Sequence, residues 1–190
     1  MAIFHVYFDL TLLENPEIPV WDVLSRVWRG VHGASVKAQV PFAVAFPRYM
    51  NREFELGNVF RVFVSSTEEA ERLYDMIDSR DDLKEWVSGS RIRTASKTDR
   101  YEAYVMHRLS SSTVGLQYRQ NEEMLNQQHL RRTRQLAQQQ SLPFVRMRSS
   151  TGNAFRLVFE RVAVAADASG MPNGYGLSRR NSLVAIPVVD

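Results

Sequence analysis

The sequence contains no cysteine, and this absence excludes disulfides, iron–sulfur clusters and cysteine-based zinc sites. Long apolar runs are also missing, because no segment approaches the roughly 18 apolar residues of a membrane-spanning helix. The opening stretch, MAIFHVYFDL, has no basic start and carries Asp9 where a signal peptide would be apolar. We therefore expect a folded protein of a reducing compartment, the cytoplasm, with no membrane partner.

Lysine is scarce, since only Lys37, Lys84 and Lys97 among the 24 basic residues are lysines. Residues 1–90 carry 9 basic and 14 acidic side chains (net −5), whereas residues 91–190 carry 15 and 7 (net +8). The planar guanidinium of arginine suits phosphate groups and guanine edges, so the second half predicts a polyanionic partner. The alternative is an arginine-rich surface that only reflects a GC-rich genome.

Motifs of metal and cofactor chemistry are absent as well. The histidines, His5, His32, His107 and His129, are scattered, and none lies in HExxH or beside a close pair of carboxylates. The chain has no GxxxxGKS/T or GxGxxG phosphate loop and no GxSxG elbow. Nucleotide hydrolysis, dinucleotide redox chemistry and serine hydrolysis of that type are disfavoured, and we expect no metal and no cofactor.

Alternating apolar residues in the first half predict three strands, over residues 2–12, 40–46 and 59–64. Between the first two, apolar residues recur at helical spacing from Val20 to Val31. Gly30 and Gly33 mark where we expect this helix to end.

A second helix is predicted after Ser66, because Glu69 completes a capping box and an apolar stripe follows. A short helical piece over residues 81–87 and a strand near Ile92 come next. The order is β-α-β-β-α-β, the ferredoxin-like arrangement that many RNA-binding domains share. We assign it to residues 1–96, although element order alone does not define function.

A second domain is predicted over residues 97–190, where acidic residues thin out and Ser, Gln and Arg become common. Its expected elements are a strand over 101–107, a polar helix over 118–140, a hairpin over 141–159 and a last apolar strand. A helix this polar usually faces solvent or a charged partner. The predicted fold class is therefore α+β, with a ferredoxin-like (RRM-like) domain followed by a basic α+β domain.

Two arginines stand out in the hairpin sequence SLPFVRMRSSTGNAFRLVF, residues 141–159. If Pro143 opens a strand, period-two alternation places Phe144, Arg146 and Arg148 on one face and the apolar residues between them on the other. Two arginines on one strand face require an anionic partner.

Metal-free cleavage of RNA fits this composition, since RNA brings its own nucleophile, the 2′-hydroxyl. Such an enzyme needs a base for the hydroxyl proton, neutral or cationic groups beside the phosphate, and contacts that hold the ribose in line. One histidine, a hydroxyl or two and several arginines suffice, and the chain contains them.

Several stretches resemble the CRISPR-repeat endoribonucleases of the type I-F (Csy) system. LPFVRMRSSTGNAFRLVF (142–159) and GYGLS (174–178) are similar to that family's C-terminal signature. VLSRVWRGVHGASV (23–36) resembles its histidine-bearing helix, and VAFP with ELGNVFRVF resembles the strands that follow. The likeness spans most of the chain and is weak over residues 97–140.

The resemblance implies catalytic roles for individual residues. His32 matches the family's catalytic histidine, which is proposed to deprotonate the 2′-hydroxyl; otherwise His32 is a helix-end histidine packed beside Trp28. The family's catalytic serine lies in the turn after the arginine strand. This turn is one residue shorter here, so Ser149 and Ser150 both match, and ordinary turn serines are the alternative.

Two aromatic residues also match the family. Tyr175 matches a tyrosine near the site, where a phenol could orient the histidine or the phosphate. Phe155 matches an aromatic residue that stacks on a base at the foot of the RNA hairpin. The alternative for Phe155 is a place in the core, with Leu157 and Phe159 on the same strand face.

The family's RNA-gripping helix is dense in arginine, and this chain departs from that pattern, because Glu122 and Glu123 interrupt its polar helix. Helical spacing still places Arg131 and Arg134 on one face, where they could follow phosphates. The arginines expected to contact RNA are Arg108, Arg119, Arg131, Arg134, Arg146 and Arg148. The polar helix is then the RNA-facing element of the second domain.

The resemblance implies a metal-independent endoribonuclease that cuts CRISPR repeat transcripts at the base of a hairpin. It would stay on the guide RNA together with the other subunits of the CRISPR surveillance complex. One alternative is a catalytically weak subunit of the same kind of complex that only binds the RNA hairpin. A nucleic-acid-binding regulator unrelated to CRISPR would explain the charge distribution, but not the GYGLS match.

Overall fold

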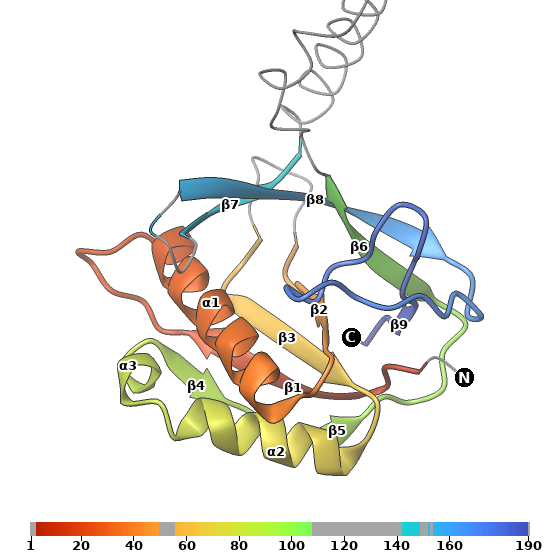
Figure 1. The fold of residues 1–190 in the computed structure, drawn as a ribbon, viewed down its shortest axis with the longest axis horizontal. Coiled ribbons are helices and arrows are strands. Elements are labelled where there is room, and N and C mark those ends of the chain that lie inside the picture. Colours follow the sequence, from red (N-terminus) through yellow and green to blue (C-terminus); the bar gives the residue numbers. More distant parts are fainter. Residues whose placement is uncertain (1–2, 50–55, 108–141, 149–151, 153, 190) are drawn as a thin grey trace, which may run out of the picture.

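The computed structural model describes residues 3–49, 56–107, 142–148, 152 and 154–189 (Figure 1). Several predictions fall outside these ranges. They concern the polar helix over 118–140, the two serines of the hairpin turn and four arginines: Ser149, Ser150, Arg108, Arg119, Arg131 and Arg134.

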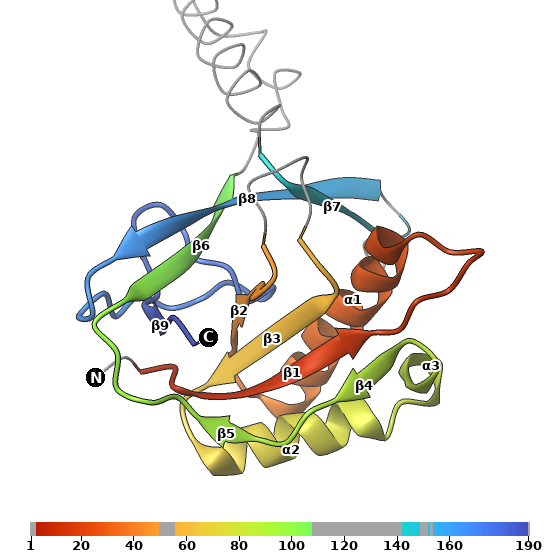
Figure 2. The same cartoon turned by 180° about the vertical axis from the view of Figure 1, so that it is seen from behind.

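The first half of the chain forms an antiparallel sheet (Figures 1 and 2). Its strands are β1 (Val6–Leu12), β2 (Ala43–Ala45), β3 (Val59–Val64), β4 (Val87–Gly89) and β5 (Arg93–Thr94). They lie in the order β2-β3-β1-β4, and β5 also pairs with β1. The element order predicted from the sequence is therefore present, with a central β1 that is hydrogen-bonded on both sides.

Two strands of this sheet are shorter than predicted. The first strand begins at Val6 rather than at residue 2. β2 covers only part of residues 40–46, because Pro41 has no N–H to donate and the N–H of Val40 is used by the carbonyl oxygen of Ser35 at 3.1 Å. β3 has the predicted bounds.

Helix α1 (Val20–Ala38) continues through Gly30 and Gly33, so the predicted end of this helix is wrong. It ends where Gln39 adopts a left-handed conformation with φ of 54°. Gly30 stays helical because it permits close packing: a Cβ atom there would lie 2.5 Å from Cδ1 of Leu83. The energy gained from this contact between α1 and the segment after α2 outweighs the low helix propensity of glycine.

Helix α2 (Thr67–Asp78) begins at the predicted cap, where Ser66 Oγ accepts a hydrogen bond from the N–H of Glu69 at 3.2 Å. The Glu69 carboxylate bonds the N–H of Ser65 at 3.1 Å. The next helix, α3 (Asp81–Lys84), is shorter than predicted, because the chain already pairs with β1 from Val87. No helix in the described part of the chain is both long and apolar enough to cross a membrane.

The second half contributes a second antiparallel sheet. Its strands β6 (Tyr101–His107), β7 (Phe144–Arg148), β8 (Ala154–Val164) and β9 (Ile186–Pro187) lie in the order β7-β8-β6-β9. The predicted strand over 101–107 and the predicted hairpin are thus confirmed. The alternation of β7 is confirmed too, since Val145 and Met147 are buried while Arg146 and Arg148 are exposed.

An aromatic cluster joins the two sheets. The rings of Phe46, Phe60 on β3 and Phe159 on β8 have centroids 5.5, 5.2 and 5.6 Å from that of Trp28 on α1. All four side chains are almost fully buried, within one continuous core. The chain is therefore a mixed α+β protein whose halves share a core, and the division at residue 96 stays a prediction.

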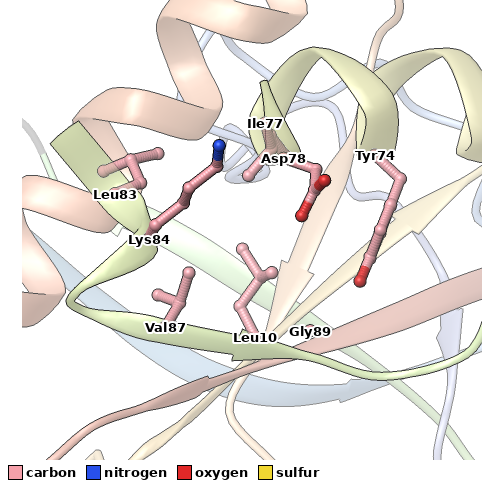
Figure 3. A pocket seen from close by; sticks show the side chains of 8 residues that line it. All are labelled: Leu10, Tyr74, Ile77, Asp78, Leu83, Lys84, Val87 and Gly89. Carbon is pink, nitrogen blue, oxygen red and sulfur yellow. The ribbon is translucent and has the colours of Figure 1, made fainter. Parts of the chain in front are cut away.

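A small pocket opens between α2, α3 and the strands β1 and β4 (Figure 3). Its lining residues are Leu10, Tyr74, Ile77, Asp78, Leu83, Lys84, Val87 and Gly89. None of the predicted site residues is among them. The candidate active site is instead located between α1 and the second sheet.

Candidate active site

Helix α1 places His32 at the edge of the aromatic core. His32 follows Trp28 by four residues, so both lie on the same side of the helix. Trp28 is fully buried, whereas His32 is half-buried. The Trp28 Nε1–H donates a 2.8 Å hydrogen bond to the carbonyl oxygen of Tyr175, which fixes the GYGLS segment against this helix.

The GYGLS segment forms a tight turn that requires glycine at position 176. Gly176 has φ of +77°, and a Cβ atom there would lie 2.7 Å from both Phe42 Cε2 and Val44 Cγ1. Its carbonyl oxygen accepts a 3.0 Å hydrogen bond from the N–H of Val44 on β2. The turn is therefore fixed on the first sheet although it comes from the end of the chain.

The turn brings a backbone carbonyl to His32. The His32 Nδ1 lies 2.5 Å from the carbonyl oxygen of Gly174. Because a carbonyl oxygen can only accept, Nδ1 must carry the proton, and in the neutral imidazole Nε2 is then the atom with a free lone pair. This is the state in which Nε2 can accept a proton from a substrate.

Tyr175 stacks on the imidazole. The two rings have centroids 4.5 Å apart and an interplanar angle of 26°. Burial raises the pKa of the Tyr175 phenol, and the Arg29 guanidinium opposes this in part. The phenol is thus protonated near neutral pH, where it can donate a hydrogen bond but cannot act as a base.

Phe155 extends the row of rings. Its ring lies 6.0 Å from that of Tyr175 at an angle of 60°, and its side chain is half-buried, unlike Leu157 and Phe159 on the same strand face. Three elements that are far apart in sequence therefore supply adjacent rings: α1 supplies His32, the GYGLS turn Tyr175, and β8 Phe155.

The exposed face of the hairpin is basic. Arg146 on β7 is directly opposite Arg156 on β8, and both are exposed, as is Arg148. Like charges directly opposite in a sheet repel each other, so an anion beside them would be stabilising. The Arg156 guanidinium lies over the Phe144 ring, 4.7 Å from its centroid. The hairpin is held to α1 by Ser25 Oγ, which donates a 2.6 Å bond to the Arg146 carbonyl oxygen.

Sequence reasoning brought out three residues that the structure places together, His32, Tyr175 and Phe155, but it missed two others. Arg156 could have been found from the register of the hairpin. Arg148 pairs with Ala154, so the residues two positions farther along each strand, Arg146 and Arg156, are also opposite each other. Asn173 could have been found as an asparagine that precedes a glycine turn, a frequent turn signature. The roles predicted for Ser149 and Ser150 concern residues outside the described ranges.

The fold and the site together define an α+β protein with a stacked histidine–tyrosine pair and with exposed arginines on the outer face of the β7–β8 hairpin. The family described as CRISPR-associated protein (Cas_Csy4) matches residues 7–188 of the chain. The chain therefore belongs to the Csy4 family, the type I-F CRISPR repeat-processing endoribonucleases. No curated protein matches it significantly. The resemblance noted in the sequence is confirmed over nearly the whole chain.

Proposed function

We propose that this protein cleaves CRISPR repeat transcripts at the base of a hairpin, with the RNA's own 2′-hydroxyl as nucleophile. The products are a 2′,3′-cyclic phosphate and a 5′-hydroxyl, and neither a metal nor a cofactor takes part. The observation that carries the proposal is the bond between His32 Nδ1 and the Gly174 carbonyl, because it leaves Nε2 as a base. The strand order β2-β3-β1-β4, which is ferredoxin-like, supports an RNA-binding frame.

His32 acts as the general base in this scheme. Its Nε2 removes the 2′-hydroxyl proton while the O2′ atom forms a bond to phosphorus. The bond from phosphorus to the 5′ oxygen breaks, and this oxygen takes up a proton from water. The Gly174 carbonyl stabilises the imidazolium that results, since a cationic ring donates a stronger hydrogen bond than a neutral one.

The neighbouring aromatic residues orient the reacting groups. Stacking on Tyr175 keeps the imidazole plane fixed, and the protonated phenol is a hydrogen-bond donor for the scissile phosphate. Phe155, half-buried at the end of the row, stacks on a base at the foot of the hairpin. Such stacking contributes roughly 1 to 3 kcal/mol of binding free energy per base.

Hydroxyl and arginine side chains complete the proposed site. Ser149 or Ser150 holds the ribose in line for attack. Arg146 and Arg148 contact the RNA backbone next to the cut, in keeping with their exposure on β7. The remaining predicted RNA contacts are Arg108, Arg119, Arg131 and Arg134. After cleavage the protein stays on the guide RNA with the other subunits of the surveillance complex.

One experiment tests this mechanism. The protein is incubated with a repeat hairpin in EDTA, with and without a 2′-deoxy substitution at the nucleotide 5′ of the cut. We expect cleavage that survives EDTA and disappears with the deoxy substrate. Hairpin binding without cleavage would show a binding subunit instead of an enzyme, and cleavage of the deoxy substrate would exclude 2′-hydroxyl attack.

A further inference from the structure

Asn173 is one of the few buried polar residues in the described part of the chain, and its side chain holds the turn at the active site. It is 9% exposed. Its Oδ1 accepts hydrogen bonds from the N–H groups of Tyr175 at 2.8 Å and Leu177 at 3.2 Å. Its Nδ2 faces the Met106 sulfur at 3.4 Å. Oδ1 therefore makes the strong contacts of this side chain, both of them to the backbone of the turn.

One of these contacts is linked directly to the catalytic histidine. The N–H of Tyr175 and the carbonyl of Gly174 belong to the same peptide group. In this trans peptide they point in opposite directions, one to Asn173 Oδ1 and the other to His32 Nδ1. A continuous chain of hydrogen bonds thus runs from Asn173 through one peptide plane to the imidazole, and bonds in such chains polarise one another.

The orientation of this peptide plane decides which nitrogen of His32 carries the proton. Gly174 lacks a side chain, so rotation of the plane by half a turn meets little steric resistance from that residue. The rotated plane would present the Tyr175 N–H to Nδ1, and Nδ1 would then have to be the acceptor. The proton would move to Nε2, and His32 could no longer act as the base.

We propose that Asn173 is a positioning residue that selects the Nδ1–H form of His32 by locking the peptide between Gly174 and Tyr175. The proposal rests on the proposed function, in which Nε2 is the base. The proposal also predicts the position of the His32 proton in the protein without RNA, where it can be measured independently of cleavage. The role of Asn173 and the proposed cleavage function can therefore be disproved separately.

The test compares Asn173→Ala with Asn173→Asp. The alanine variant removes Oδ1, whereas the aspartate variant keeps an oxygen acceptor in its place. Met106→Leu is the matched control, since it removes the sulfur that contacts Nδ2 and leaves both contacts of Oδ1 in place. Asn181→Ala changes an exposed asparagine in a neighbouring turn. Thermal unfolding checks each variant, and if Asn173→Ala is unfolded, Asn173→Ser replaces it.

The first readout is long-range ¹H–¹⁵N NMR of the His32 ring in the protein without RNA. We expect the Nδ1–H form in the unchanged protein, in Asn173→Asp and in both controls, and a mixture in Asn173→Ala. The second readout is single-turnover cleavage. We expect Asn173→Ala to cleave roughly 10- to 100-fold more slowly, the loss typical when a group that orients an imidazole is removed, with unchanged hairpin affinity.

The outcomes distinguish the two proposals. An unchanged protein that binds the hairpin without cleaving it contradicts the proposed function, while the NMR result still decides the role of Asn173. Retention of the Nδ1–H form in a folded Asn173→Ala variant would overturn the positioning role. So would slow cleavage by Asn173→Ala without any change in the ring proton, since a merely structural defect would produce it.

Discussion

At the scale of single residues, the site depends on how neighbouring groups fix the orientation of the His32, Tyr175 and Phe155 side chains. His32 has a fixed proton on Nδ1 because a carbonyl lies beside it, and a fixed plane because Tyr175 is stacked on it. Phe155 borders Tyr175 and remains half-exposed. In the proposed mechanism, the orientation of the imidazole supplies the catalytic advantage.

Replacing His32 by alanine should separate catalysis from binding. We expect the single-turnover cleavage rate to fall by roughly 10² to 10⁴, the contribution of a general base, while hairpin affinity changes little. Rate and affinity are measured on the same RNA, and His5→Ala serves as the control, because His5 lies at the start of the chain beside Ile3. Equal losses of rate and affinity would favour a packing role for His32.

Tyr175 should matter more through its ring than through its ionisation. Tyr175→Phe keeps the stacking and should cost less than Tyr175→Leu, since an aromatic pair contributes roughly 0.5 to 1.5 kcal/mol. The pKa of Tyr175 is raised, so its phenol stays protonated to beyond its ordinary range. The pH–rate profiles of the unsubstituted protein and Tyr175→Phe should therefore have the same shape up to about pH 10, whatever the difference in their absolute rates. The prediction would be contradicted if, below about pH 10, the rate of the unsubstituted protein fell with rising pH while that of Tyr175→Phe did not.

At the scale of elements, the β7–β8 hairpin combines two functions in its two faces. Its buried face, with Val145 and Met147, packs on the core, and its exposed face carries arginines in register. Because alternate residues point to opposite faces, substitutions of the exposed arginines should leave the packing of the buried face intact.

The arginines of this face should contribute to RNA affinity through phosphate contacts. We expect the variant Arg146→Gln/Arg148→Gln to bind the hairpin more weakly and to lower the slope of log affinity against log salt by roughly one per lost contact. Arg72→Gln, an exposed arginine on α2, is the matched control. If the double variant had the same slope of log affinity against log salt, the RNA would not contact this face of the hairpin.

Several elements could be predicted from the sequence, because local patterns determine them. Strands with clear alternation, such as 59–64 and 101–107, have their predicted bounds. The predicted end of α1 was wrong. Gly30 lies inside this helix, where it allows close packing against Leu83, and no local sequence pattern reveals such a contact. The bond between His32 and Gly174 joins residues 142 positions apart, so its geometry follows only from the assembled fold.

At the scale of the whole molecule, a buried ion pair ties the end of the chain to the first sheet. Arg61 on β3 makes two bonds to the Asp9 carboxylate, at 2.7 and 3.0 Å, and a third to the carbonyl oxygen of Val189 at 2.8 Å. The Arg61 side chain is only 8% exposed. These partners therefore compensate the burial of its positive charge.

Removing one partner of this pair should destabilise the entire protein. We expect Asp9→Asn to lower the free energy of unfolding by roughly 3 to 5 kcal/mol, because Arg61 is left buried without its carboxylate. Chemical denaturation followed by both tryptophan fluorescence and circular dichroism should show one transition at a lower midpoint. Asp81→Asn, which alters an exposed pair with Lys84, should leave the midpoint unchanged. Two separate transitions would show that the halves unfold independently.

The distance along the chain between His32 and its partner carbonyl has a consequence for biosynthesis. A ribosome adds roughly 5 to 20 residues per second, so the 142 residues between them take roughly 7 to 28 s to make. During this time the growing chain carries its histidine but not the turn that fixes the proton on Nδ1. Under the proposed mechanism we therefore expect cleavage activity to begin only once the GYGLS turn has been made and has folded back onto α1, and chains that end before this turn should be inactive.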